Sequence, residues 1–136
     1  MITIEVPIKT VSEANNQEHW TKKSKRHSQQ QFFVRHALKK NNIKINLPCS
    51  IKLTRLAPRI LDDDNLPVSM KYIRDEIAAY IFPEKVITYK RNGKTYSNKG
   101  NADSDPQVTW LYSQEKLWNY SVRIEIKSKE KNEDNT

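Results

Sequence analysis

Apolar and polar residues alternate in four segments of the chain, at residues 2–8, 49–56, 107–114 and 120–127. Alternation with a period of two puts every second side chain on one face of an extended chain, so each segment is predicted to be a strand with one buried face. The last two segments follow each other closely, and we expect these two strands to pair with each other.

The long segment at residues 20–40 has the spacing of a helix. Val34 and Leu38 recur four residues apart, as do other apolar residues nearby, and this spacing places them on one helical face. Asn41 and Asn42 are plausible ends for this helix, because asparagine tolerates the left-handed conformation common at a C-terminal cap.

A second helix is predicted after residue 64. Asp64 or Asn65 can cap it, Pro67 is tolerated only in its first turn, and Pro83 ends it. The apolar residues that repeat at helical spacing are Met70, Ile73, Ile77 and Ile81.

Residues 86–99 are predicted to form an exposed β-hairpin, because Asn92-Gly93 is a favoured two-residue turn. The resulting order, β-α-β-α-hairpin-β-β, indicates an α+β fold in which a mixed β-sheet packs against two helices. The chain of 136 residues has the length of one domain, which we place at residues 1–128. Residues 129–136 are polar and are expected to form a disordered tail.

The chain has a net charge of +8. Excess positive charge favours a polyanionic partner, most often nucleic acid, although a soluble basic protein without such a partner is the plain alternative. Cys49 is the only cysteine, which excludes an internal disulfide and fits a reducing compartment. No leader and no long apolar run is visible, so we expect a cytoplasmic protein with no membrane partner.

Two acidic groups stand out in this basic chain. Asp62, Asp63 and Asp64 lie between a predicted strand and a predicted helix, and Asp103 and Asp105 precede the third predicted strand. Two carboxylates 4 Å apart repel by about 1 kcal/mol in water and about 4 kcal/mol at an effective dielectric of 20, and a bound Mg²⁺ turns that repulsion into attraction. If the groups converge, such a site activates water to attack a phosphodiester. Each group alone is more often a helix cap or a solvated turn.

Lys71 and Asp75 lie four residues apart on the second predicted helix and therefore share a face. Lys71 could neutralise a phosphate or a leaving oxygen, and a surface ion pair is the alternative. Basic residues crowd the first predicted helix and favour a DNA-binding face over a merely solvated one. The candidate DNA-binding residues are Lys22, Lys23, Lys25, Arg26 and Arg35. We expect the tryptophans to be core or dimer-contact residues; they are Trp20, Trp110 and Trp118.

In the order of these motifs, the chain resembles the RusA-like Holliday junction resolvases, which are common in phages and prophages. The similarity spans about residues 16–125, and Leu66-Pro67-Val68 and residues 85–101 look like additions to the family pattern. The matching elements are Asp62-Asp63-Asp64-Asn65, Lys71-Tyr72-Ile73-Arg74-Asp75 and Asp103-Ser104-Asp105-Pro106-Gln107-Val108.

By position, the resemblance implies that Asp62, Asp64 and Asp105 bind the metal, that Lys71 is the catalytic lysine and that Asp75 is a supporting acid. It also implies a hydrolase of DNA recombination and repair. Such an enzyme acts as a homodimer that cuts four-way junctions with Mg²⁺, or with Mn²⁺ in its place, and needs no small-molecule cofactor. Two alternatives stay open: a non-catalytic basic DNA-binding protein of the same fold, and a module that binds an acidic protein partner.

Overall fold

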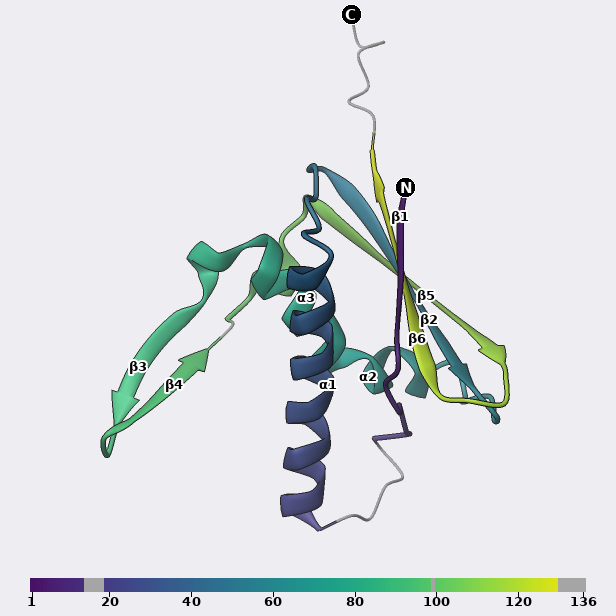
Figure 1. The fold of residues 1–136 in the computed structure, drawn as a ribbon, viewed down its shortest axis with the longest axis horizontal. Coiled ribbons are helices and arrows are strands. Elements are labelled where there is room, and N and C mark those ends of the chain that lie inside the picture. The colour runs from purple at the N-terminus through teal and green to yellow at the C-terminus, as the bar shows by residue number, and fades with distance from the viewer. Residues whose placement is uncertain (14–18, 99, 130–136) are drawn as a thin grey trace, which may run out of the picture.

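The fold is built on a four-stranded mixed sheet, seen in a computed structural model that describes residues 1–13, 19–98 and 100–129 (Figure 1). Its strand order is β1-β6-β2-β5. β2 and β5 run parallel, and β6 is antiparallel to both of its neighbours. The four strands lie close to the predicted segments and are β1 (Ile2–Val6), β2 (Cys49–Ala57), β5 (Val108–Lys116) and β6 (Ser121–Ser128).

The expected pairing of the last two strands is wrong. β2 lies between β5 and β6, so each of these two strands pairs with β2 and they do not pair with each other. The reason is burial: Ile51, Leu53 and Leu56 of β2 are fully buried, and a strand that is apolar along its length takes a central position with a partner on each side. Alternation within β5 and β6 specifies a buried face for each strand but does not specify which neighbour it pairs with.

The first helix, α1 (Trp20–Lys40), has the predicted bounds. The predicted second helix is divided into α2 (Asn65–Ser69) and α3 (Lys71–Ile81), because Met70 has a non-helical ψ of 2° and its N–H bonds to the Pro67 carbonyl three residues back. Asp64 stands at the first cap position but makes no side-chain capping hydrogen bond.

The helices and the sheet share one hydrophobic core. α1 and α3 contact each other and lie to one side of the sheet (Figure 1). Val34 of α1 and Ile77 of α3 are fully buried in the same cluster as Leu53 of β2 and Ile124 of β6. The coarse prediction of an α+β fold with a mixed sheet and helices is therefore confirmed.

The predicted hairpin is confirmed as a separate two-stranded sheet of β3 (Ile87–Arg91) and β4 (Lys94–Asn98), which extends away from the main body (Figure 1). Asn92 and Gly93 have φ values of 53° and 76°, and two positive φ values in succession are what a two-residue hairpin turn of this kind requires. Two 3₁₀ turns flank the hairpin: η1 (Pro83–Lys85) and η2 (Ala102–Ser104).

The far C-terminus is only partly described. Lys129 is held by a hydrogen bond from its N–H to the Pro48 carbonyl, 2.8 Å long. The rest of the predicted tail, residues 130–136, lies outside the described residues, as do residues 14–18 and Lys99. None of the helices in the described segments is long and apolar enough to cross a membrane.

Candidate functional site

Lys71 and Asp75 lie on the first turns of α3, with Lys71 Nζ 3.6 Å from Asp75 Oδ2. Their predicted position on one helical face is thereby confirmed. Both line an open pocket of about 520 Å³ between α3, η2 and the hairpin, and Asp103 of η2 and Tyr89 of β3 line it as well. The pocket of Lys71 thus contains two carboxylates, Asp75 from the same helix and Asp103 from η2.

Arg74 holds η2 against the body of the protein. Its Nη2 donates to the Asp103 carbonyl at 2.9 Å, and its Nε lies 3.2 Å from Asp103 Oδ2. Nη1 donates to the Tyr112 hydroxyl at 2.9 Å, and the guanidinium lies over the Trp110 ring at 4.8 Å. Sequence reasoning gave Arg74 no role of its own. Only the fold shows that this side chain ties α3, η2 and β5 together and so positions Asp103.

Asp105 is engaged elsewhere. Lys85 Nζ lies 2.6 Å from its Oδ2, and the Gln107 backbone N–H donates to Oδ1 at 2.9 Å. The hydrogen bond from Lys85 and the one from Gln107 hold the pKa of the Asp105 carboxyl below its ordinary value. This carboxylate is therefore ionised and already neutralised by a lysine.

The aspartate triplet occupies the other end of β5. Asp62, Asp63 and Asp64 are exposed in the connection between β2 and α2. The preceding residue, Leu61, is fixed to β5 by two hydrogen bonds: its N–H donates to Gln114 Oε1 at 2.9 Å, and Gln114 Nε2 donates to its carbonyl at 2.7 Å. The start of the triplet is thus anchored beside Gln114.

Asp105 and the aspartate triplet are attached at different points along β5. Asp105 precedes the first residue of β5, Val108, whereas the triplet begins beside Gln114. Six residues of strand at about 3.3 Å each separate Val108 from Gln114 by about 20 Å. Across residues 1–13, 19–98 and 100–129, no three histidine, cysteine, aspartate or glutamate side chains lie close enough together to hold a metal ion.

Strand direction is the physical reason why the two points of attachment lie apart. β2 and β5 are parallel, with Cys49 opposite Val108 and Ala57 opposite Lys116. The segment that leaves the end of β2 therefore emerges at the opposite end of β5 from Asp105. The motif order along the chain predicted convergence of Asp62, Asp64 and Asp105, but it carried no information on strand direction.

One side of α1 continues the pocket of Lys71. Trp20, Lys23 and His27 line an adjoining pocket of about 370 Å³, and Tyr72 lines both pockets. His27 stacks on Tyr72 with a centroid separation of 3.7 Å and an interplanar angle of 17°. We call the two adjoining pockets the α1–α3 groove. It combines cationic, aromatic and acidic side chains along one path.

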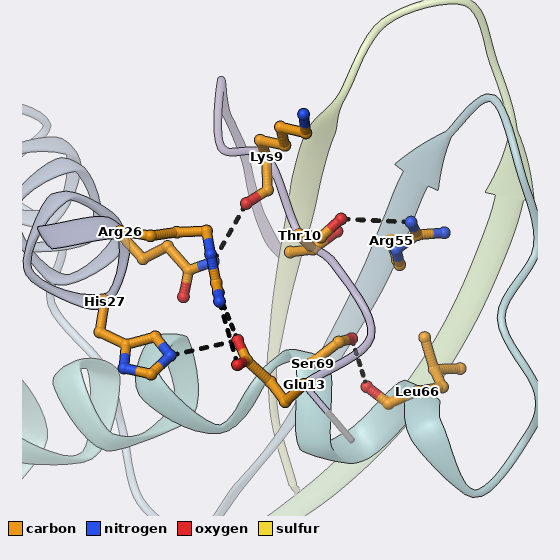
Figure 2. Close-up of polar contacts among 9 residues, drawn as sticks. Lys9, Thr10, Glu13, Arg26, His27, Arg55, Leu66 and Ser69 are labelled. Carbon is orange, nitrogen blue, oxygen red and sulfur yellow. Dashed lines mark hydrogen bonds and ion pairs between the residues drawn. The ribbon is translucent and has the colours of Figure 1, made fainter. Parts of the chain in front are cut away.

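The other predicted DNA-binding residues face different directions. Lys22 and Lys25 line a separate pocket on the opposite side of α1. Arg26 pairs with Glu13 (Figure 2), and Arg35 Nη1 lies 3.0 Å from the buried Glu76 carboxylate. The predicted single basic face is therefore divided among several sides of the helix.

Two of the three tryptophans depart from a core role. Trp20 and Trp118 are 72% and 94% exposed, and only Trp110 packs against the core. Large exposed aromatic rings of this kind are available to a partner.

Comparison of the chain with protein-family models, with curated proteins and with solved structures finds no match. The assignment of function therefore depends on the motifs and on the geometry of the α1–α3 groove.

Proposed function

We propose that this protein is an endonuclease that binds and cuts branched DNA. The observation that carries the proposal is the position of Lys71, beside Asp75 and Asp103, in a groove that continues to Lys23 and Trp20. The motif order shared with the RusA-like resolvases supports the same activity, and the net charge of +8 supports a polyanionic substrate.

In this proposal each group in the groove has a role that its chemistry allows. The exposed Lys71 ammonium contacts the scissile phosphate and stabilises the negative charge that develops on it. Asp75 keeps that ammonium oriented across the 3.6 Å gap. Lys23 binds a neighbouring phosphate, and Trp20 and Tyr72 offer ring faces to unpaired bases near a branch point.

Asp62 and Asp64 lie in the segment that Leu61 anchors beside Gln114, and no carboxylate cluster for the implied divalent ion is assembled among the described residues of one chain. The proposal therefore assigns no step to a metal bound by a single chain. A homodimer, likewise implied by the resemblance, is part of the proposal, since a second copy is one way to bring the separated carboxylates together.

A synthetic four-way junction tests the activity. The chain is incubated with labelled junction or linear duplex, in Mg²⁺, in Mn²⁺ or in EDTA, and products are resolved on a denaturing gel. We expect nicks in the junction, little cleavage of the duplex and no cleavage in EDTA. Lys71→Gln should slow cleavage by about 100-fold or more while changing junction affinity by less than about tenfold, because charge stabilisation acts mainly in the transition state.

Lys40→Gln is the matched control, since it removes the same charge from the exposed end of α1. Cleavage by Lys71→Gln at the rate of the parent would remove Lys71 from the mechanism. Absence of cleavage in all ions, with intact binding, would overturn the nuclease proposal.

A second candidate is a non-catalytic protein that binds branched DNA. It is favoured by one observation, the absence of an assembled carboxylate cluster in the described segments. This candidate predicts junction binding that weakens steeply with salt, because phosphate contacts release counterions, and no cleavage with either ion. The same gel assay, paired with a binding titration at several salt concentrations, separates the two.

A further inference from the structure

A second pocket lies on the other side of α1, away from the α1–α3 groove. Its walls are the segment that follows β1 and the first half of α1, and its volume is about 640 Å³. Pockets for small organic ligands measure roughly 300–1,000 Å³, so this N-terminal pocket has room for such a molecule.

The walls of the N-terminal pocket are cationic. Lys22 and Lys25 come from α1, whereas Lys9, from the segment after β1, has its ammonium over the Tyr120 ring at 5.2 Å. Within the described segments no acidic side chain lines the pocket, and Arg26, which also lines it, is paired with Glu13 (Figure 2). Several ammonium groups around one concave surface favour an anion such as phosphate.

Gln30 adds a buried polar group to this pocket. The residue is 2% exposed, and its Nε2 donates to the Lys9 carbonyl at 3.0 Å. Its Oε1 is buried and has no hydrogen-bond partner among the residues that the structure describes. A buried acceptor without a partner costs about 1–3 kcal/mol, so a ligand that donates an N–H or O–H here gains a favourable contact.

The remaining lining is apolar, with Val11 on one wall and Phe33 on the other. A flat ring placed between them would be removed from water on both faces. The pocket therefore offers three kinds of contact at once: ammonium groups for an anion, apolar surface for a ring and one buried acceptor for a donor group.

We propose that the N-terminal pocket binds a nucleotide unit. The phosphate lies against Lys22 and Lys25, the base lies between Val11 and Phe33, and a donor of the base or sugar reaches Gln30 Oε1. The unit is either a free nucleotide or an unpaired nucleotide of a bound DNA. The site does not depend on cleavage, because it shares no lining residue with the pocket of Lys71.

Titration calorimetry of the full chain tests the site with three probes: deoxyadenosine monophosphate, deoxyadenosine and inorganic phosphate. We expect the nucleotide to bind more tightly than either part alone. Gln30→Leu, which keeps the side-chain volume but removes the amide, should weaken nucleotide binding about tenfold and leave phosphate binding unchanged. Lys22→Gln with Lys25→Gln should weaken both nucleotide and phosphate.

The charge control is Lys39→Gln with Lys40→Gln, which removes two cations from the same helix outside this pocket and should change neither titration. If Gln30→Leu does not fold, as judged by circular dichroism, Phe33→Asn serves instead, because Phe33 is half-exposed and its loss should weaken the nucleotide more than phosphate.

Fluorescence of 2-aminopurine distinguishes the two sources of the nucleotide. The probe is placed either as a single unpaired base in a duplex or fully paired. A Gln30-dependent change for the unpaired probe alone indicates DNA, and one for the mononucleotide alone indicates a free nucleotide. The inference is overturned if neither responds, or if phosphate binds as tightly as the nucleotide with no effect of Gln30→Leu.

Failure here is separable from failure of the proposed nuclease. Lys71→Gln should retain nucleotide binding in the absence of divalent ions, and Gln30→Leu should retain the catalytic residues of the α1–α3 groove. Loss of one property without the other shows which proposal is wrong.

Discussion

At the scale of single residues, Glu13 is a buried carboxylate that pairs with two side chains of α1. Its side chain is only 8% exposed, and it joins the segment after β1 to α1 through Arg26 and His27 (Figure 2). Burial disfavours the charged carboxylate, but the hydrogen bonds from Arg26 and His27 outweigh burial and hold the Glu13 pKa below its ordinary value of 4.5. Glu13 thereby fixes one wall of the N-terminal pocket.

We expect Glu13→Gln to lower the free energy of unfolding near neutral pH by about 2 kcal/mol, because it weakens charge-assisted hydrogen bonds. Because the pKa of Glu13 is lower in the folded state than in the unfolded state, the ionised carboxylate stabilises the fold fully at a pH above the unfolded-state pKa. This stabilisation is lost as the pH falls through the folded-state pKa. The difference between parent and variant should therefore be constant from about pH 6 upward and shrink below pH 4.5. Urea titrations across this range measure it, and a difference that grows on acidification would contradict this account.

At the scale of secondary-structure elements, the feature with the largest effect on the site is the attachment of η2 to α3 and β5. Arg74 makes this attachment through Asp103, Tyr112 and the Trp110 ring. The η2 turn follows the hairpin, which adds no buried residue to the core. The position of Asp103 in the α1–α3 groove thus depends on Arg74, on the 3.0 Å hydrogen bond from Trp110 Nε1 to the Asp103 carbonyl and on the buried Ala102 beside it.

We expect Arg74→Gln to lower the free energy of unfolding by about 2–3 kcal/mol, because it removes the hydrogen bonds to the Asp103 carbonyl and to Tyr112 and the ion pair with the Asp103 carboxylate. Cleavage of a four-way junction should fall more than junction affinity, since Asp103 loses its fixed position. Arg91→Gln in the exposed hairpin is the control and should change stability by less than about 0.5 kcal/mol. Equal effects of the two substitutions on stability would refute the role given to Arg74.

At the scale of the whole molecule, the parallel pairing of β2 and β5 makes the segment that leads from β2 to Asp64 emerge at the opposite end of β5 from Asp105. A site shared between two copies of the chain, as in the homodimer that we propose, would require Asp64 from one copy and Asp105 from the other.

Mixing two inactive variants tests this requirement. Asp64→Asn and Asp105→Asn should each lack cleavage, and a 1:1 mixture should regain nicking. In a mixed dimer one site combines both substitutions, whereas the other site contains both native aspartates. Light scattering should show a dimer, and the regained activity should depend on subunit exchange.

A mixture that stays inactive although mixed dimers form would exclude a site shared between copies. Full activity of either single variant would instead remove that aspartate from the proposed site.

Local patterning along the chain was sufficient to predict most elements. Apolar residues recur at helical spacing within residues 20–40, and this segment forms α1 with the expected bounds. Asn92-Gly93 specifies its turn through positive φ values. These features depend on residues that are close together in the sequence, so the local sequence is sufficient to predict them. The shared face of Lys71 and Asp75 was predictable for the same reason.

Tertiary structure alone decided which distant groups meet. Sequence patterns do not specify strand order or direction, so the pairing of β5 with β2 and the ion pair of Asp105 with Lys85 could not be anticipated. The same holds for the role of Arg74. Which side chains become neighbours depends on the packing of the whole core, and no single segment of the sequence specifies it.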